Sequence, residues 1–403
     1  MKFNIISYGF LGNQQIYKTD IKQLVGGAEV YLYDLSKYLL SLGHRVKVIQ
    51  SGEKNDEFIY DGIEVKTIKL PGICRKIGFI PENYYEFNWF WIKYLDKSVD
   101  RVHLHYLQHA WPFASKDMTA TCHGIDWDIP KNEYIYYQKQ VYPSPYKYLL
   151  RPFYYFNRFS NRKIFTKYGI KHLKKILSVD SSLLRYVQSE YPDFRKKINV
   201  IFNYVDVNIF KPLPIDPIFS EKFKGKFIIL FPRNLSINRG VHYIIEAMKI
   251  VIKKYPEVLL LITGDGIAKK YILKIINDYN LSKNVILLGR LNHYSELPKY
   301  YNLADLVVIP TAYSEGTSLS CLEAMATGKP VIATNIGGLY DIINSGQNGL
   351  IVQPDYREIA QGIIKILDDG TLRLNLGNSA LETIKGKFSK EIWEAKIKTF
   401  FEL

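Results

Sequence analysis

Cysteine is nearly absent from this sequence. Its 403 residues include only Cys74, Cys122 and Cys321, and no two of them form a C-x-x-C pair. An odd, widely spaced set of this kind excludes a disulfide framework and a structural zinc site, and it is typical of a reducing compartment. We therefore expect a cytoplasmic protein.

Long apolar runs and repeats are also lacking. No apolar stretch reaches the roughly 18 residues that a membrane-spanning helix needs, and the opening MKFNIISYGFLG is too short an apolar run for a signal peptide. No Gly-X-Y repeat, heptad run or low-complexity tract occurs, which excludes fibrous and solenoid proteins. No Asp-x-Asp pair or histidine cluster has convincing metal-ligand spacing, so we expect no metal site.

Acidic residues are outnumbered by basic ones. The chain has 54 Lys and Arg against 39 Asp and Glu, a net charge of +15, which favours an anionic partner. The surplus is local, because residues 151–200 hold 12 basic and 3 acidic side chains whereas residues 301–350 hold one and four. A protein that coats nucleic acid would be basic throughout and would carry a recognisable module, so we expect no nucleic-acid partner.

Apolar residues make up 47% of the chain, enough for a sizeable core, and the length suits two domains. Short apolar runs alternate with helix-length segments, which predicts parallel strands covered on both faces. In the first half these runs are 2–8, 45–50, 100–105, 118–123, 175–180 and 198–203. In the second half they are 226–232, 257–264, 284–289, 305–310, 330–334 and 349–354.

A hinge is predicted at residues 203–217, which contain three prolines. We expect an α/β protein of two Rossmann-like doubly wound domains, over residues 1–207 and 208–387. Residues 388–403 read as a terminal helix that packs back on the N-terminal domain. A ligand cleft is expected between the domains, at the carboxyl ends of the strands.

The most informative stretch is EGTSLSCLEAMATGKPVIAT, residues 315–334. It follows a predicted strand and opens a helix near Ser318, where a close backbone approach and unpaired amides favour a phosphate. The residues expected to bind it are Gly316, Thr317, Ser318 and Leu319. Glu315 and Glu323 are eight residues apart, so both can face the same cleft.

Two further segments add phosphate chemistry. Arg233 lies at the end of the predicted strand 226–232, and Arg239 precedes a predicted helix at Gly240. The two guanidiniums could therefore clamp a diphosphate. The turn LITGDG at 261–266 contains Gly264 and follows another strand. That turn alone is a weak signal.

Together these motifs resemble the retaining glycosyltransferases of family 4, which have the GT-B fold. Glu315 and Glu323 fit the E-x(7)-E motif of that family, and the resemblance covers nearly the whole chain. Other matching segments are GGAE (26–29), Cys122-His123-Gly124, N-x-VD-x-x-x-FKP (203–212), LITGDG and ADLVVIP (304–310). Arg239 stands where the family usually has Lys, and Tyr204 replaces the usual Gly of NGVD.

The resemblance implies roles for these residues. Glu323 would hold the ribose hydroxyls of a nucleotide, and Glu315 would contact the transferred sugar. Arg233 and Arg239 would bind the diphosphate, and Gly26 and Gly27 would contact it from the other domain. His123 would reach toward the reacting carbon. The catalytic set implied is therefore Glu315, His123, Arg233 and Arg239.

The activity implied is transfer of a hexosyl unit from a UDP-, GDP- or ADP-sugar to a glycan or lipid-linked glycan acceptor, without a cofactor. Breaking the anomeric C–O bond leaves negative charge on the diphosphate, which two arginines and a helix N-terminus can stabilise without a metal. Retention could follow front-face displacement or a covalent intermediate on Glu315; we favour sugar positioning for Glu315. The alternatives are a nucleotide-sugar epimerase of the same fold and a non-catalytic nucleotide- or glycan-binding scaffold.

Two segments of the first half suggest where the protein works. Residues 84–94 are rich in aromatics and could form a face for lipid or acceptor. Residues 151–175 are basic and could bind anionic lipid headgroups, which would attach the protein peripherally to a membrane, or a polyanionic glycan. A core-packed helix and a solvated helix face are the structural alternatives. His103, His105 and His109 favour a structural or acceptor-lining role over metal binding.

Overall fold

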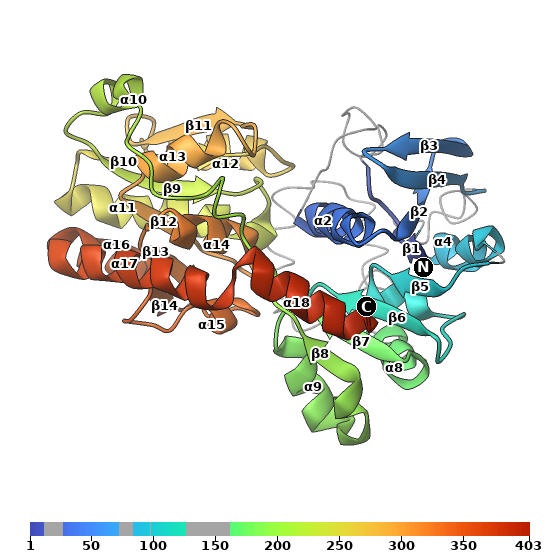
Figure 1. Cartoon of the computed structure of the whole chain (residues 1–403). Helices are drawn as coiled ribbons and strands as arrows, with labels where there is room; N and C mark the ends of the chain where they lie inside the picture. The colour runs from blue at the N-terminus through green and yellow to red at the C-terminus, as the bar shows by residue number, and fades with distance from the viewer. Residues whose placement is uncertain (12–26, 72–83, 97, 126–161) are drawn as a thin grey trace. The chain divides into compact units, whose positions relative to one another are not determined.

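The computed structural model describes residues 1–11, 27–71, 84–96, 98–125 and 162–403 (Figure 1). The chain divides into two compact units: residues 1–123, 145–201 and 400–403 form the first, and residues 124–144 and 202–399 form the second. Gly26, Cys74 and the segment 151–161 lie outside the described residues.

The first unit is built on an eight-stranded sheet in the order β3-β4-β2-β1-β5-β6-β7-β8. All neighbouring strands are parallel except β3 and β4, which form an antiparallel hairpin at one edge (Figure 1). The strands are β1 (Lys2–Ile6), β2 (Arg45–Gly52), β3 (Asp56–Tyr60), β4 (Ile63–Lys69), β5 (Arg101–Leu104), β6 (Met118–Cys122), β7 (Lys175–Ser178) and β8 (Ile198–Val200).

The helices of the first unit connect these strands. Its described α-helices are α2 (Gly27–Ser41), α4 (Tyr84–Phe90), α8 (Arg162–His172) and α9 (Ser182–Glu190). Short 3₁₀ turns lie at η1 (Trp91–Tyr94), η2 (Leu107–Ala110) and η4 (Pro192–Lys197). Helix α2 buries Leu32, Leu35 and Leu39, whose helical spacing predicts this face.

The second unit contains a six-stranded parallel sheet in the order β11-β10-β9-β12-β13-β14. The strands are β9 (Phe227–Pro232), β10 (Val258–Thr263), β11 (Val285–Gly289), β12 (Leu306–Ile309), β13 (Val331–Thr334) and β14 (Leu350–Val352). Every residue of β10, β12 and β13 is buried, as continuous apolar runs require of strands covered on both faces.

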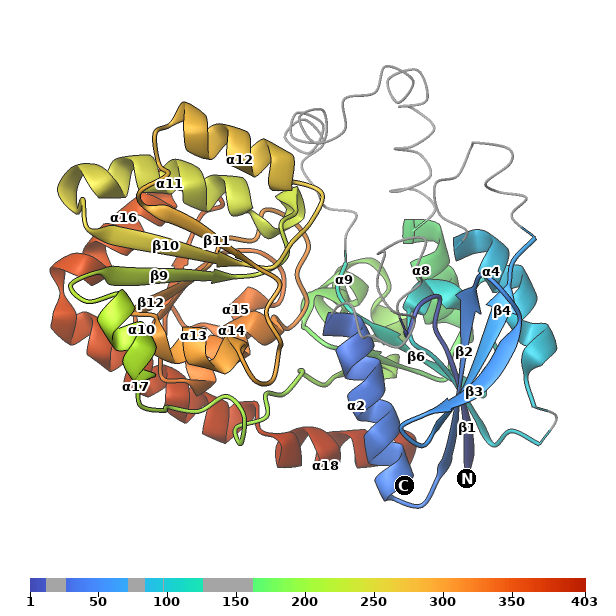
Figure 2. The same ribbon diagram turned by 90° about the horizontal axis from the view of Figure 1, so that it is seen from above.

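Helices cover both faces of this second sheet. Figure 2 shows α11 and α12 on one side of the strands and α13 and α14 on the other. The helical elements are α10 (Pro217–Lys222), η5 (Ile237–Arg239), α11 (Val241–Lys254), α12 (Lys269–Asp278), α13 (Leu297–Leu303), α14 (Leu319–Ala326), α15 (Leu339–Ile342), α16 (Tyr356–Asp368), α17 (Gly370–Lys387) and α18 (Lys390–Phe401). In both sheets the parallel strands follow the Rossmann order, with the first and fourth strands of the series adjacent.

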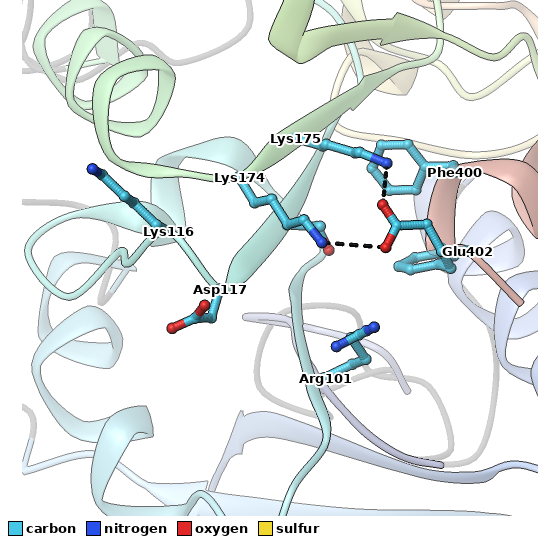
Figure 3. Close-up of a pocket in the computed structure, with 9 residues that line it drawn as sticks. Arg101, Lys116, Asp117, Lys174, Lys175, Phe400 and Glu402 are labelled. Atoms are coloured by element: carbon cyan, nitrogen blue, oxygen red, sulfur yellow. Dashed lines mark hydrogen bonds and ion pairs between the residues drawn. The ribbon is translucent and has the colours of Figure 1, made fainter.

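The end of α18 belongs to the first unit. There the Phe401 ring lies 5.5 Å from the ring of Phe3 and 5.3 Å from that of His103. The Glu402 carboxylate accepts hydrogen bonds from Lys175 at 2.6 Å and Lys174 at 3.3 Å, beside a small pocket (Figure 3). Among the described residues, no helix has the length and apolar character needed to cross a membrane.

Candidate functional site

The site in the second unit lies where the strand order of its sheet reverses. Strands β9 and β12 are neighbours, but the chain leaves them toward opposite edges of the sheet, and ligands of doubly wound sheets bind at such a point. Arg233 directly follows β9, and Thr311 and Glu315 lie in the loop after β12. The strand pattern thus brings together residues that are about 80 positions apart in sequence.

Glu315 is the centre of a charged cluster. Arg233 donates to both of its carboxylate oxygens, at 3.0 Å and 2.7 Å, and Arg239 donates to Oε2 at 2.7 Å. The Thr311 hydroxyl donates to the same oxygen at 2.9 Å and accepts from Arg233 at 2.7 Å. The structure therefore brings together Arg233, Arg239 and Glu315, and it places the carboxylate on both guanidiniums.

This cluster is buried on one side and open on the other. The side chains of Arg233 and Glu315 are 6% and 7% exposed, whereas that of Arg239 is 38% exposed. Burial alone would raise the pKa of Glu315, but Arg233, Arg239 and Thr311 outweigh it and hold that pKa below its usual value. Burial also lowers the pKa of Arg233. At neutral pH the cluster carries two positive charges and one negative charge.

Two glycines allow the backbone to close around these arginines. Gly264 has φ +85°, and a Cβ there would lie 2.7 Å from the carbonyl oxygen of Arg233. Gly240 has φ +73° at the start of α11, and a Cβ there would lie 1.6 Å from the carbonyl oxygen of Pro310. Gly264 therefore contacts the backbone that carries Arg233, and only glycine fits there without strain.

Helix α14 begins beside the charged cluster. Ser318 is its N-cap residue and Leu319 its first residue, close to the start predicted from the sequence. The Ser318 hydroxyl is buried and has no hydrogen-bond partner within the part of the chain that the structure describes. Thr317 is held by Asn203, whose side-chain amide donates to the Thr317 carbonyl at 3.0 Å. Gly316 joins this helix start to Glu315.

Glu323 lies in the second turn of α14. It is 5% exposed, and each of its carboxylate oxygens accepts one hydrogen bond: Oε1 from His293 and Oε2 from Tyr301, both at 2.8 Å. Burial and the Glu323 charge raise the pKa of Tyr301 well above its ordinary value, so the phenol stays a donor. The positive charge of Arg233 offsets part of that rise in the pKa of Tyr301.

The first unit holds His123 at the end of β6. Its Nε2 lies 3.4 Å from Nδ1 of His105, and its ring packs against Tyr31 of α2 and against Tyr106. Burial lowers the pKa of His123 to about 4, so the imidazole is neutral at pH 7. Gly124 has φ +121°, which explains a glycine after this histidine.

Of the two predicted loop glycines, Gly27 is the first residue of α2 and is exposed, and Gly26 is outside the described residues. The neighbouring histidines His103 and His109 are buried and form hydrogen bonds with side chains of the same unit. His103 contacts the hydroxyls of Thr119 and Thr121 at 2.8 Å each, and His109 contacts Asn88 at 2.7 Å. Among the described residues no group of three or more His, Cys, Asp or Glu side chains could hold a metal ion.

Three residues of the second-unit site are absent from the sequence expectations: His293, Tyr301 and Thr311. They reach the two glutamates from other elements, since Tyr301 belongs to α13 and His293 to the loop after β11. Their position near the carboxyl ends of β11 and β12 is the signal that could have identified His293 and Thr311. Nothing local to the sequence marks Tyr301.

Two family models match the chain in tandem. The model described as Glycosyltransferase Family 4 matches residues 25–209, and the model described as Glycosyl transferases group 1 matches residues 215–383. The two matches meet within the hinge predicted at 203–217.

Curated relatives agree with these matches. The chain is 31% identical to the uncharacterized glycosyltransferase MJ1607 of Methanocaldococcus jannaschii over 53% of its own length and 56% of the relative. It is 32% identical to the capsular polysaccharide biosynthesis glycosyltransferase CapM of Staphylococcus aureus over 44% of its length and 46% of the relative. The matched stretch thus spans about half the length of these relatives.

Solved structures show the same fold. The chain aligns with sucrose-phosphate synthase from Thermosynechococcus elongatus at a TM-score of 0.76 and 21% identity, covering 100% of this chain and 98% of that one. Anabaena HepE in complex with UDP-glucose aligns at a TM-score of 0.70 and 17% identity, covering 100% of both chains. These findings confirm the predicted GT-B fold of two Rossmann-like units. The chain therefore belongs to the glycosyltransferases: its first half matches the Family 4 model and its second half matches the group 1 model.

Proposed function

We propose that the protein is a retaining glycosyltransferase that moves a hexosyl unit from a nucleotide-diphosphate sugar to a glycan or lipid-linked glycan acceptor, without a metal ion. The observation that carries the proposal is the cluster of Arg233, Arg239 and Glu315 at the switch point of the second sheet. Two guanidiniums with one carboxylate between them retain a positive charge, which suits a diphosphate.

We propose that the diphosphate of the donor replaces the Glu315 carboxylate as the partner of Arg239. A diphosphate carries more negative charge than one carboxylate, so it competes for Arg239, the more exposed of the two arginines. Glu315, released from that contact, can accept a hydrogen bond from a sugar hydroxyl. The Ser318 hydroxyl at the start of α14, which has no partner among the described residues, and the amides beside it supply further donors to phosphate oxygens.

The chemical step that the protein must assist is the departure of the diphosphate from the sugar. As the anomeric C–O bond breaks, charge builds on the leaving phosphate, and the preorganised arginines stabilise it in a buried site. The neutral imidazole of His123 can both donate and accept a hydrogen bond, as the role toward the sugar that the resemblance implies for it requires. A nucleotide-sugar donor is also supported by HepE, whose structure contains UDP-glucose.

The acceptor side of the proposal rests on the first unit. Helix α8 presents the exposed Lys163, Lys167 and Ile164, and its Phe165 stacks on Trp111 at 4.8 Å. Trp111 in turn contacts Trp89, which is 49% exposed. A basic helix beside exposed aromatics suits the headgroup region of an anionic membrane, so we place the protein in the cytoplasm, attached peripherally.

The donor claim is tested by a thermal-shift screen of UDP-, GDP- and ADP-sugars with the full chain, followed by product analysis with lipid-linked and soluble glycan acceptors. A bound donor raises the unfolding temperature by mass action, and transfer should persist in excess EDTA. Strict metal dependence would contradict the mechanism. Conversion of the donor sugar without acceptor would indicate an epimerase, and binding without any turnover would indicate a scaffold.

The membrane claim needs a separate experiment. Sedimentation with anionic liposomes at rising salt should show binding that weakens as charges are screened. A Lys163→Gln/Lys167→Gln variant should bind less than the wild type. If the wild type fails to sediment with the vesicles at low salt, membrane attachment is wrong while the donor chemistry is unaffected.

A further inference from the structure

Glu323 is held from two sides by groups that its own helix does not supply. His293 Nε2 binds Oε1 and the Tyr301 hydroxyl binds Oε2, each at 2.8 Å. The Tyr301 side chain is fully buried, while that of His293 is 34% exposed. His293 is therefore the partner of Glu323 that lies toward solvent.

One phenylalanine supports both partners. The Phe210 ring lies 5.3 Å from the ring of His293 and 5.8 Å from that of Tyr301. Phe210 is 3% exposed and belongs to the second unit's core cluster, so it provides a fixed backing. The imidazole also packs on Tyr294 at 4.8 Å. These contacts hold His293 in place rather than leaving it free to turn away from Glu323.

The two hydrogen bonds from His293 and Tyr301 fix which acceptor positions of the Glu323 carboxylate a ligand can use. An ionised carboxylate has about four acceptor positions, two on each oxygen. Within the described part of the chain, one position on each oxygen of Glu323 is occupied and one on each oxygen remains. Two acceptors fixed side by side can each accept one hydrogen bond from the two adjacent hydroxyls of a ribose, the ligand that the resemblance to family 4 implies for Glu323.

We infer that His293 is a positioning residue that fixes the Glu323 carboxylate so that the site distinguishes a ribonucleotide from its 2′-deoxy analogue. The inference rests on the proposed function, because it takes the ligand to be a nucleoside diphosphate. Without the His293 donor, the carboxylate can rotate about its last bond, and its second acceptor no longer stays aimed at the 2′-hydroxyl. His293 thus acts through Glu323 and needs no contact with the nucleotide.

The test compares two variants at the same position. His293→Phe keeps an aromatic ring against Phe210 but removes the N–H donor, whereas His293→Gln keeps an N–H donor. Calorimetric dissociation constants are measured for the tightest binder among UDP, GDP and ADP and for its 2′-deoxy analogue. The readout is the ratio of the two constants, which a loss of folded protein does not change.

The wild type should bind the ribonucleotide about tenfold more tightly than the deoxynucleotide, in line with one lost hydrogen bond to a charged group. His293→Phe should reduce this ratio to about twofold, and His293→Gln should restore most of it. An unchanged ratio in His293→Phe would overturn the inference while leaving nucleotide binding intact. If none of the three diphosphates binds the wild type, the proposed function fails, and the inference fails with it.

Discussion

At the scale of single residues, the contact between Arg233 and Glu315 combines stability with chemistry. Both side chains are more than nine-tenths buried, and each satisfies the charge of the other. Breaking a buried ion pair by removing one partner leaves an uncompensated charge in a poorly solvated place. Under the proposed function, the same burial strengthens the attraction between Arg233 and the charge on the leaving diphosphate.

The two arginines should therefore differ in their effect on stability. We predict that Arg233→Ala lowers the free energy of unfolding by about 3 kcal/mol, as expected for a broken buried pair. Arg239→Gln should lower it by less than about 1 kcal/mol, because Arg239 is partly solvated. Urea unfolding of both variants measures the difference. Equal losses would contradict the unequal burial of the two side chains.

Buried histidines predict a sensitivity to mild acid. Burial lowers the pKa of His103 to about 3, against an ordinary value of 6.5. Between these values the unfolded chain binds a proton that the folded chain refuses, so stability falls as the pH drops from about 6.5 toward 3. His109 has the same shift and the same sign.

A variant without the titrating ring isolates this effect. His103→Gln keeps groups that can bond Thr119 and Thr121 but cannot take up the proton. Urea unfolding at about pH 7 and about pH 5 should show a smaller loss of stability on acidification in His103→Gln than in the wild type. Parallel losses in the two proteins would show that His103 does not contribute to the acid sensitivity.

At the scale of elements, the turn after β10 supports the strand end that carries Arg233. Gly264 and Gly225 both have positive φ, of 85° and 72°, but only Gly264 faces another backbone. We predict that Gly264→Ala weakens nucleotide-sugar binding about tenfold or more, because the new methyl group displaces the Arg233 carbonyl. Gly225→Ala shares the backbone strain in open space and should leave binding unchanged. Similar affinities of both variants for the donor would contradict this role of the turn.

The end of α18 makes a second prediction at this scale. Phe401 is 3% exposed and packs on Phe3 and His103, so Phe401→Ala should lower the free energy of unfolding by about 3 kcal/mol. Glu402→Gln should change it little, because its ion pairs with Lys174 and Lys175 are solvated. Chemical denaturation of the two variants measures both. If Glu402→Gln lost more free energy of unfolding than Phe401→Ala, the ion pairs and not the packing of Phe401 would hold the end of α18.

At the scale of the whole molecule, every parallel strand except β4 could be predicted, because these strands are read from local patterns. Runs such as VLLLIT and VIAT are buried throughout, so their composition alone predicts β10 and β13. The hairpin of β3 and β4 was not predicted, since β3 alternates between half-buried and exposed residues. Its Asp61-Gly62 turn, with positive φ at both residues, was the available signal.

Sequence motifs single out the candidate residues but not the contacts between them. Arg233, Arg239, Glu315 and Glu323 stand out in short motifs that resemble a known family. That Glu315 binds both arginines, or that His293 and Tyr301 hold Glu323, depends on packing between elements far apart in sequence. Such contacts follow from the order of strands in the sheet, which no local pattern encodes.

The most direct test of the central claim is the dissociation constant of a nucleotide-diphosphate sugar for the wild type and for Arg239→Gln, measured by calorimetry on the full chain. Arg239 is the arginine whose loss should leave the fold intact, so a change in affinity reports on the diphosphate contact. The account predicts binding at least about tenfold weaker in Arg239→Gln, as expected for a lost charge-assisted hydrogen bond. Equal affinity of the two proteins would contradict it.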